Sequence, residues 1–171
     1  MYDHNLYYKP PLWLRNGHVQ SVWPTLFRKV SLTEPVRESL PTEDDDELHL
    51  DWYRQGSDRL AVLSHGLEGH SQRPYMQGLA RALLNDGWDV LAWNFRSCGG
   101  VMNHQPRFYH SGATGDLDRV VKHGLAQGYG KVMLSGFSMG GNLTLLYLGQ
   151  KSEQVDNRIC GAITYSVPCD L

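Results

Sequence analysis

Short apolar runs alternate along the chain with segments whose apolar residues recur at helical spacing. Four such runs lie at 60–64, 89–94, 131–135 and 158–165, and they are continuously hydrophobic rather than alternating. Continuous runs are typical of strands covered on both faces, as in parallel sheets. We therefore predict βαβ units with right-handed crossovers.

Two helices are predicted between these strands. The first begins at Pro74 and ends at 85–87, and its apolar residues share one helix face: Met76, Leu79, Ala80, Leu83 and Leu84. The second lies between the second and third runs, with Ser111 or Thr114 as its expected cap and Gly128 beyond its end. Its apolar residues repeat the same spacing: Leu117, Val120, Val121 and Leu125.

The residues before the first βαβ unit predict different structure. Residues 30–40 and 48–53 are expected to pair as antiparallel strands joined by the acidic loop 43–47. The first 29 residues are rich in Trp, Tyr and Pro without clear periodicity, so we interpret 1–29 as an irregular segment packed on the sheet. Without a repeat or an interdomain linker, 1–171 is expected to form a single domain.

The composition is that of an ordinary globular protein, with 41% hydrophobic residues, 20% charged residues and a net charge of -2. This balance favours neither a nucleic-acid-binding surface nor a polybasic membrane-binding surface. Three cysteines at spacings unlike those of zinc ligands predict reduced thiols in a cytoplasmic protein. The N-terminus lacks the features of a signal peptide, and no apolar stretch is long enough to predict a transmembrane helix.

Residues 136–140, Gly-Phe-Ser-Met-Gly, form a G-x-S-x-G motif between the run 131–135 and a helix-like segment. A strand, a glycine-flanked serine and a helix make up a nucleophile elbow. The sharp turn forces unusual dihedrals on Ser138, and side chains at Gly136 or Gly140 would collide with the strand or the helix. The motif predicts Ser138 as a nucleophile with an exposed Oγ; a glycine-rich turn without chemistry is the alternative.

Ester hydrolysis needs hydrogen-bond donors for the oxyanion of the tetrahedral intermediate. In a nucleophile-elbow fold one donor is the backbone N–H after the nucleophile, which is Met139 here. The other comes from the loop after the first strand of the βαβ units, where His65 and Gly66 stand. Glycine lets the backbone approach the substrate, so we predict the Leu67 N–H as the second donor.

A third loop, 94–100, follows the second strand and ends at the same carboxyl edge of the sheet, where ligands bind in open α/β folds. Within it, Arg96 is suited to anchoring an acidic group or to bracing the neighbouring loops. Cys98 is a weaker nucleophile candidate, because no histidine-bearing pattern accompanies it. We interpret His65 and His70 as structural rather than as a metal pair, and we predict no metal or cofactor.

Several motifs together resemble the YheT-like branch of the α/β-hydrolases: 15–21, 65–69, 94–100, 109–112, 136–142 and 166–171. The resemblance spans essentially the whole chain. It implies an α/β-hydrolase fold, a mostly parallel sheet with helices on both faces. It also implies serine-dependent hydrolysis of carboxylic esters, with acylglycerol, phospholipid or acyl-transfer substrates in better-known relatives. Ser138 carries over as the nucleophile.

The chain departs from this family in its catalytic triad. α/β-hydrolases present nucleophile, acid and histidine in that order, whereas the last histidine here, His123, precedes Ser138. The family's acid and histidine come from later strands and loops, so we expect the fold to be C-terminally truncated, and Asp170 is not assigned as the acid. His70 replaces the small residue usual in the family, a minor change.

Three classes of function therefore stay open: an esterase half completed by another chain, an inactive fragment, and a module that binds an acyl ligand without cleaving it. Transfer of the acyl group to an alcohol stays open beside hydrolysis. The run 158–165 is expected to leave an unpaired strand edge, which invites self-association or completion by a second chain.

Overall fold

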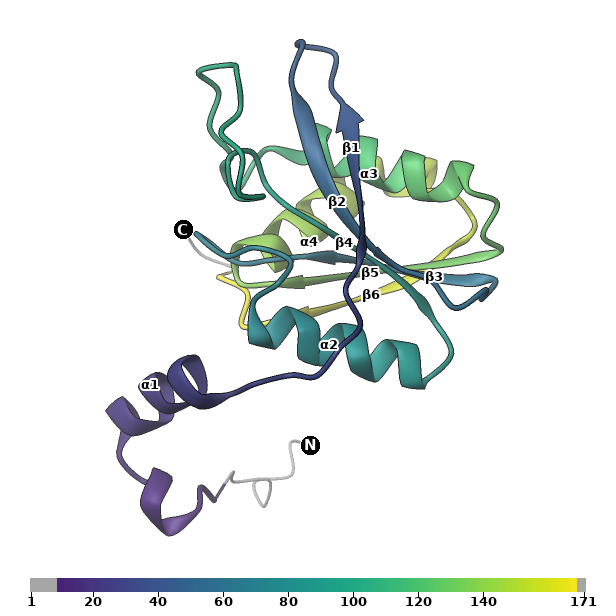
Figure 1. The fold of residues 1–171 in the computed structure, drawn as a ribbon. Helices are drawn as coiled ribbons and strands as arrows, with labels where there is room; N and C mark the ends of the chain where they lie inside the picture. Colours follow the sequence, from purple (N-terminus) through teal and green to yellow (C-terminus); the bar gives the residue numbers. More distant parts are fainter. Residues whose placement is uncertain (1–8, 169–171) are drawn as a thin grey trace. The chain divides into compact units, whose positions relative to one another are not determined.

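The computed structural model describes residues 9–168, and the chain divides into two compact units. The N-terminal unit comprises Met1–Ser31 and the sheet unit comprises Leu32–Leu171. In Figure 1 the ribbon is coloured along the sequence, so the N-terminal unit is purple and the sheet unit runs from blue to yellow.

The N-terminal unit contains a short 3-10 helix, η1 (Leu12–Leu14), and an α-helix, α1 (Gly17–Phe27). Asn16 begins α1, because its side chain accepts hydrogen bonds from the backbone N–H groups of His18 and Val19. The interpretation of 1–29 as irregular was therefore wrong for 17–27. That this segment packs on the sheet stays a prediction.

The sheet unit is built on six strands in the order β1-β2-β4-β3-β5-β6. Their bounds are β1 Val36–Pro41, β2 Glu47–Tyr53, β3 Arg59–Ser64, β4 Asp89–Trp93, β5 Lys131–Phe137 and β6 Ile159–Tyr165. The strands β3, β4, β5 and β6 pair in parallel, whereas β2 pairs antiparallel with both β1 and β4. This arrangement confirms the predicted parallel strands and the predicted antiparallel pair, although the first strand starts at Val36 rather than at residue 30.

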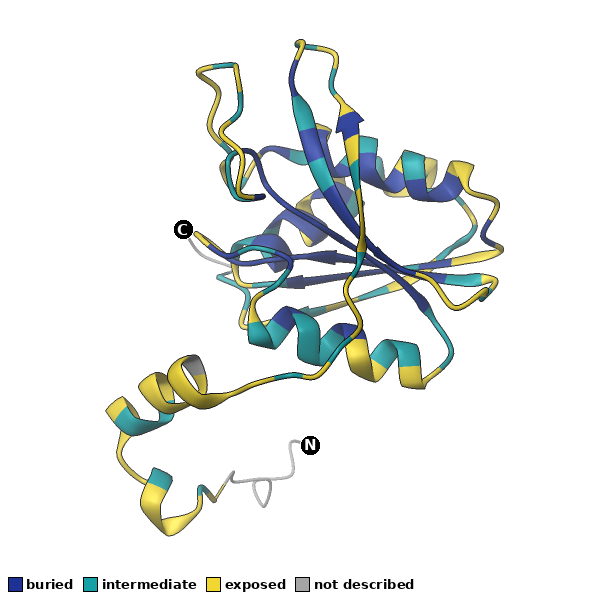
Figure 2. Ribbon diagram, viewed as in Figure 1, coloured by how far each residue is buried: buried dark blue, intermediate teal, exposed yellow. Residues whose placement is uncertain are grey.

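Helices cover both faces of the sheet, as Figure 1 shows: α2 (Pro74–Asn85) lies on one face, and α3 (Thr114–Ala126) and α4 (Met139–Lys151) lie on the other. Alternate residues of β3 supply the two cores. Leu60 and Val62 pack with residues of α3 and α4, whereas Ala61 and Leu63 pack with Met76 and Ala80 of α2. This double burial explains why β3 and β4 are continuous apolar runs, and Figure 2 shows the central strands in dark blue, whereas β6 at the edge is partly exposed.

The start of α3 differs from the expected cap. The cap of α3 is Ala113 without a capping side chain, so neither Ser111 nor Thr114 caps it.

The strand β6 is the last in the sheet order, and its Ile163 and Tyr165 are partly exposed. Within residues 9–168 the outer edge of β6 is unpaired, as expected; self-association through it stays a prediction.

We expect Leu117→Ala in α3 to lower the free energy of unfolding by about 2–5 kcal/mol, because this side chain is completely buried under the sheet. Leu146→Ala in α4 removes the same atoms from a side chain that is 38% exposed. Urea unfolding followed by circular dichroism measures both changes. Equal losses for the two variants would contradict this assignment of the core.

Candidate active site

The three predicted loops leave the sheet at one edge because the parallel strands are in register. Ser64 at the end of β3 pairs with Trp93 of β4 and Gly136 of β5, and Phe137 of β5 pairs with Tyr165 of β6. The carboxyl ends of all four strands therefore meet, as the general rule for ligand binding in open α/β sheets requires.

Ser138 occupies a sharp turn between β5 and α4. Its φ of 51° and ψ of -118° lie outside the regions that a non-glycine residue ordinarily adopts, and the residue is exposed. The turn is held by hydrogen bonds from the Ser138 N–H to the Tyr165 carbonyl (2.8 Å) and from the Asn142 N–H to the Ser138 carbonyl (3.0 Å). Its Oγ makes no hydrogen bond with the described part of the chain.

The flanking glycines are required by close backbone contacts. A Cβ at Gly136 would lie 2.3 Å from the Gly140 carbonyl oxygen, and a Cβ at Gly140 would lie 2.4 Å from the His65 carbonyl oxygen. A Cβ at Gly66 would lie 3.5 Å from the Cβ of Ser138. The start of α4 therefore packs directly on the loop after β3, and this loop runs beside the serine.

The two backbone N–H groups predicted as oxyanion donors are unoccupied among the described residues. In the loop after β3, the Gly66 N–H donates to the Tyr75 hydroxyl at 3.0 Å and the Glu68 N–H donates to the Tyr109 hydroxyl at 3.1 Å. The N–H groups of Leu67 and Met139 have no such acceptor within residues 9–168. Met139 is the first residue of α4, where N–H groups lack partners inside the helix.

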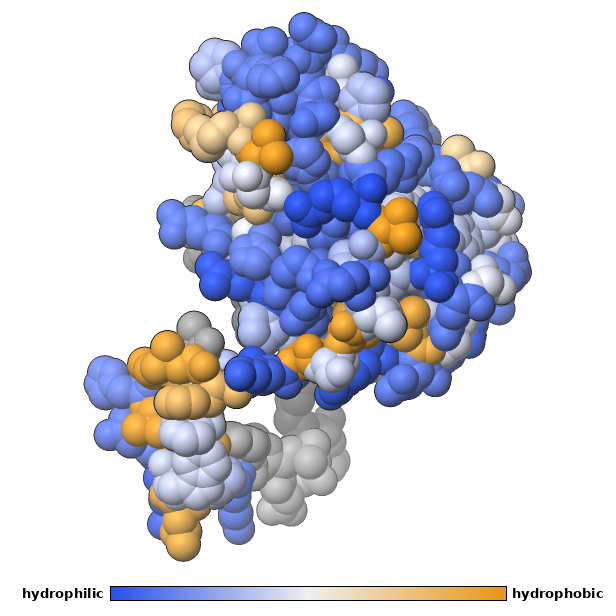
Figure 3. All heavy atoms as spheres, viewed as in Figure 1, coloured by the Kyte–Doolittle hydropathy of each residue, from blue (hydrophilic) through white to orange (hydrophobic). Residues whose placement is uncertain are grey.

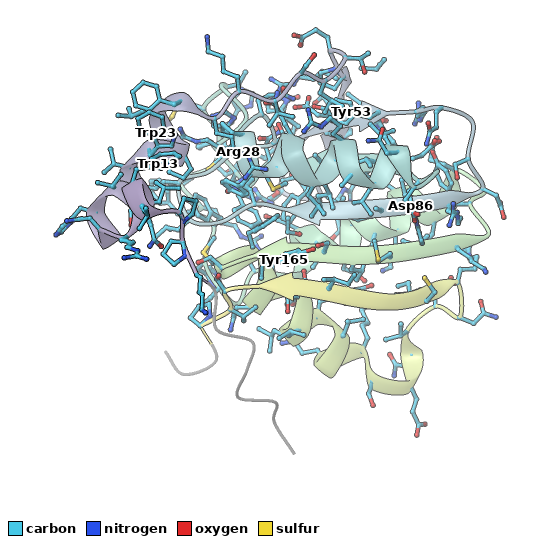
Figure 4. All side chains as sticks on the ribbon, turned by 90° about the horizontal axis from the view of Figure 1, so that it is seen from below. Trp13, Trp23, Arg28, Tyr53, Asp86 and Tyr165 are labelled. Carbon is cyan, nitrogen blue, oxygen red and sulfur yellow. The ribbon has the colours of Figure 1, made fainter. Side chains whose placement is uncertain are left out.

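The tyrosines that hold this loop were missed in the sequence. Tyr75 follows the first residue of α2, and Tyr109 belongs to a motif that was noted only for its family resemblance. Tyr75 also packs edge-on against Phe137, which stacks on Tyr165 with a centroid distance of 4.7 Å. Figure 4 labels Tyr165 at the end of β6. Aromatic residues next to the strand ends were the available signal.

His65 is a structural residue of this edge. Its Nδ1–H donates to the Gly66 carbonyl at 2.7 Å, and its Nε2 accepts from the Phe95 N–H at 3.0 Å. Complete burial lowers the pKa of His65 to about 4, so the ring is neutral. With both nitrogens occupied, His65 is not placed to bind a metal or to act as a base. Among the residues described, no cluster of three or more His, Cys, Asp or Glu could hold a metal ion.

Arg96 braces the loops rather than facing the serine. Its buried guanidinium contacts Asp116 at 2.8 Å and Asp44 at 3.0 Å, and so joins the β1–β2 turn to the start of α3. Hydrogen bonds from Thr42 and Arg96 lower the pKa of Asp44 to about 2. Of the two roles left open for Arg96, the contacts favour bracing.

A charged cleft of about 660 Å³ adjoins this ion network, lined by residues that include Asp44, Arg96, Arg107 and Arg119. Ser138 is not among its lining residues, so the cleft is distinct from the elbow.

Cys98 is half-buried, and burial raises the pKa of its thiol although Tyr109 donates a hydrogen bond to it. A raised pKa weakens a thiol as a nucleophile.

Comparison with known proteins places this geometry in context. Residues 55–168 match the family model described as "Serine aminopeptidase, S33". The putative esterase YheT of Escherichia coli (strain K12) is 33% identical over 159 residues, which cover 90% of this chain and 46% of YheT. Phospholipase ABHD3 of Homo sapiens is 29% identical over 175 residues, covering 94% of this chain and 41% of the phospholipase.

The solved structures give the same picture. The Pyrococcus furiosus esterase Pf2001 superposes with a TM-score of 0.65 at 25% identity, covering 82% of this chain and 57% of that esterase. This chain spans less than half the length of YheT and of the phospholipase.

None of the helices in the described part of the chain has the length and apolar character needed to cross a bilayer.

We expect Gly140→Ala to destabilise the sheet unit by about 1–3 kcal/mol, because the new methyl group would overlap the carbonyls of Ser64 and His65. Gly149→Ala in the same helix is the matched control, since no atom lies within 4 Å of its Cβ position. Replacing an exposed helical glycine by alanine should stabilise by about 0.5–1 kcal/mol. Urea unfolding of both variants tests the contact, and equal effects would refute it.

A second prediction concerns pH. Because the folded pKa of His65 is about 4, below its ordinary value of 6.5, the unfolded chain binds more protons between these values. The stabilisation is complete above the ordinary value and is lost as the pH falls toward the folded one. We expect the unfolding free energy to drop by about 2 kcal/mol between about pH 7 and pH 5.

His65→Gln should be less stable at both pH values but should lose less between them. His104→Gln, at an exposed position, serves as the control and should behave as the unchanged protein does. Urea titrations at the two pH values measure the difference. An unaltered pH dependence in His65→Gln would show that this histidine is not the group that titrates.

Proposed function

The chain belongs to the YheT-like esterase and lipase family of the α/β-hydrolases, and on this basis we propose that it carries the nucleophile of a serine carboxylic ester hydrolase. Its fold is the α/β-hydrolase fold that the motifs implied. The observation that carries the proposal is the exposed Ser138 on a strained turn. The backbone N–H groups of Leu67 and Met139, on the two elements where oxyanion donors are expected, have no acceptor within the described residues.

In the proposed reaction, the Oγ of Ser138 attacks the ester carbonyl carbon, and a base removes the hydroxyl proton. The carbonyl oxygen becomes an oxyanion that accepts hydrogen bonds from the N–H groups of Leu67 and Met139. Collapse of the tetrahedral intermediate expels the alcohol, which takes up the proton. Water then attacks the acyl-enzyme by the same steps and releases the carboxylic acid.

We assign the strain at Ser138 a positioning role. The turn leaves Ser138 exposed, and the hydrogen bond from the Ser138 N–H to the Tyr165 carbonyl fixes the turn to the neighbouring strand. Fixed donors aimed at a developing negative charge are worth about 10²–10³ in rate for each donor. The loop that carries Leu67 is held by Tyr75 and Tyr109, so its N–H needs little reorganisation.

Carboxylic esters of lipid type are the proposed substrates. Two of the similar proteins are named as an esterase and a phospholipase, whereas the family model is named after an aminopeptidase. The names of these two relatives favour ester substrates over peptide substrates. Apolar rings line the strand ends beside the serine, where Tyr75, Phe137 and Tyr165 pack against one another. Such a wall suits an acyl chain better than a charged group.

We further propose that the acid and the histidine of the triad lie outside residues 1–171. No histidine follows Ser138 in the sequence, and the described histidines make no hydrogen bond with its Oγ. The matched relatives are more than twice as long as the aligned part of this chain. The free edge of β6 is the proposed place for polypeptide that supplies these groups.

A fluorophosphonate probe with intact-mass analysis tests the nucleophile. We expect slow labelling of Ser138 in this chain, because no base within residues 9–168 contacts its Oγ, and faster labelling when polypeptide that supplies the base is present. Ser138→Ala should abolish the added mass. Ser152→Ala is the matched control: Ser152 is also exposed and has a similar φ of 46° and ψ of -118°, but it ends α4.

The two serine variants separate the possible outcomes. Labelling that persists in Ser138→Ala, or that is lost in Ser152→Ala, would contradict the assignment of Ser138. Labelling of Ser138 without release of an alcohol from any ester, even with the base supplied, would contradict ester hydrolysis.

A further inference from the structure

The helix α1 carries a complete apolar stripe whose larger side chains are left exposed by the described residues of its own unit. Its apolar residues follow the i, i+3, i+4, i+7, i+8 spacing of one helix face: Val19, Val22, Trp23, Leu26 and Phe27. Val22 is 53% exposed, Leu26 is 66% exposed and Phe27 is 57% exposed. Large apolar side chains gathered on one helix face mark an interaction site rather than a core.

Aromatic side chains dominate this stripe and extend it to η1. Trp13 packs edge-on against Trp23 with a centroid distance of 5.1 Å, and Trp23 packs against Phe27 at 4.3 Å. Figure 4 shows the two labelled indole groups close together, and Figure 3 shows hydrophobic residues gathered over this unit. Tryptophan combines an apolar ring with a polar N–H, and it is enriched where hydrocarbon meets water in membranes.

The same segment is basic. Residues 9–31 contain Lys9, Arg15, Arg28 and Lys29 and no Asp or Glu, although the whole chain has a net charge of -2. All four basic residues are exposed. None of them forms a salt bridge within the described residues, in contrast to Arg37 and Arg96 of the sheet unit, which are paired with aspartates.

We propose that residues 9–31 bind the surface of an anionic phospholipid bilayer. The apolar stripe of α1, with Trp13, would lie at the boundary between head groups and acyl chains, and the four basic residues would contact the anionic head groups. A stripe of Trp, Phe and Leu flanked by uncompensated positive charge is the composition of an interfacial helix. The α1 segment is too short to span the bilayer, so it would lie in the interface plane.

Charge decides between a bilayer and an apolar protein groove. A groove would need only the stripe, whereas a segment with four basic residues and no acidic residue is complementary to an anionic surface. The proposal concerns binding alone and does not rest on ester hydrolysis by Ser138. The mean composition of the chain concealed it, because the acidic residues all lie outside residues 9–31.

The test uses the full 171-residue chain and flotation with vesicles of phosphatidylcholine, with or without phosphatidylserine. We expect binding to the vesicles that contain phosphatidylserine, and weakening of that binding by salt. Brominated acyl chains in the same vesicles should quench tryptophan fluorescence, and Trp23→Phe should remove part of that quenching. These results locate the stripe at the acyl boundary.

Two pairs of variants separate the apolar and the electrostatic parts. Leu26→Asp should weaken binding by more than about tenfold, whereas Leu145→Asp in α4, at a residue that is 45% exposed, should leave binding unchanged. Arg28→Glu should weaken binding by about 25-fold, since it changes the charge by two units. Arg81→Glu makes the same change of charge at an exposed arginine of α2, and as the control it should leave binding unchanged.

Several results would overturn the proposal. One is failure of the unchanged chain to float with phosphatidylserine vesicles; another is equal binding of Leu26→Asp and Leu145→Asp. Absence of quenching by brominated lipid would mean that the stripe is covered by the chain's own sheet unit or by a protein partner. An unchanged thermal unfolding transition in each variant shows that lost binding is not lost folding.

Discussion

The contact between the start of α4 and the end of β3 is the constraint on which the rest of the site depends. The backbone of Gly140 lies against the carbonyls of Ser64 and His65 so closely that no side chain fits between them. This approach fixes the distance between the helix that follows Ser138 and the loop that carries Leu67. Two segments more than 70 residues apart in sequence therefore behave as one rigid piece, and the glycines are what makes this possible.

Hydrogen bonds around His65 extend this rigid piece to the neighbouring loops. The ring accepts from Phe95 after β4 and donates within its own loop, while Tyr75 and Tyr109 hold the N–H groups on either side of Leu67. Buried polar groups are stable only when they are paired. The N–H groups of Gly66, Glu68 and Gly69 all have acceptors, whereas the Leu67 N–H between them has none among the described residues.

The sequence predicted most of the sheet because the central strands β3 and β4 are buried on both faces, although β6 at the edge is only partly buried. It predicted the elbow because Gly136 and Gly140 stand where a sharp turn needs them. Features without a local signal were missed. The cap at Ala113 depends on backbone geometry alone. Bracing by Arg96 was one of its two predicted roles, but its aspartate partners, which are distant in sequence, were not predicted. The helix α1 had its signal in the stripe, but the surrounding Trp and Pro residues obscured it.

Because β3 is buried on both faces, the side of the sheet to which each of its residues points is strictly determined. Its alternate residues face opposite sides of the sheet: Leu60 and Val62 belong to the core with residues of α3 and α4, whereas Ala61 and Leu63 belong to the core with Met76 and Ala80 of α2. A one-residue insertion inside β3 would exchange the two sets and spoil both cores at once. The same insertion in the exposed turn 55–57 would alter neither. Natural length variation should therefore accumulate in the turns and avoid the central strand.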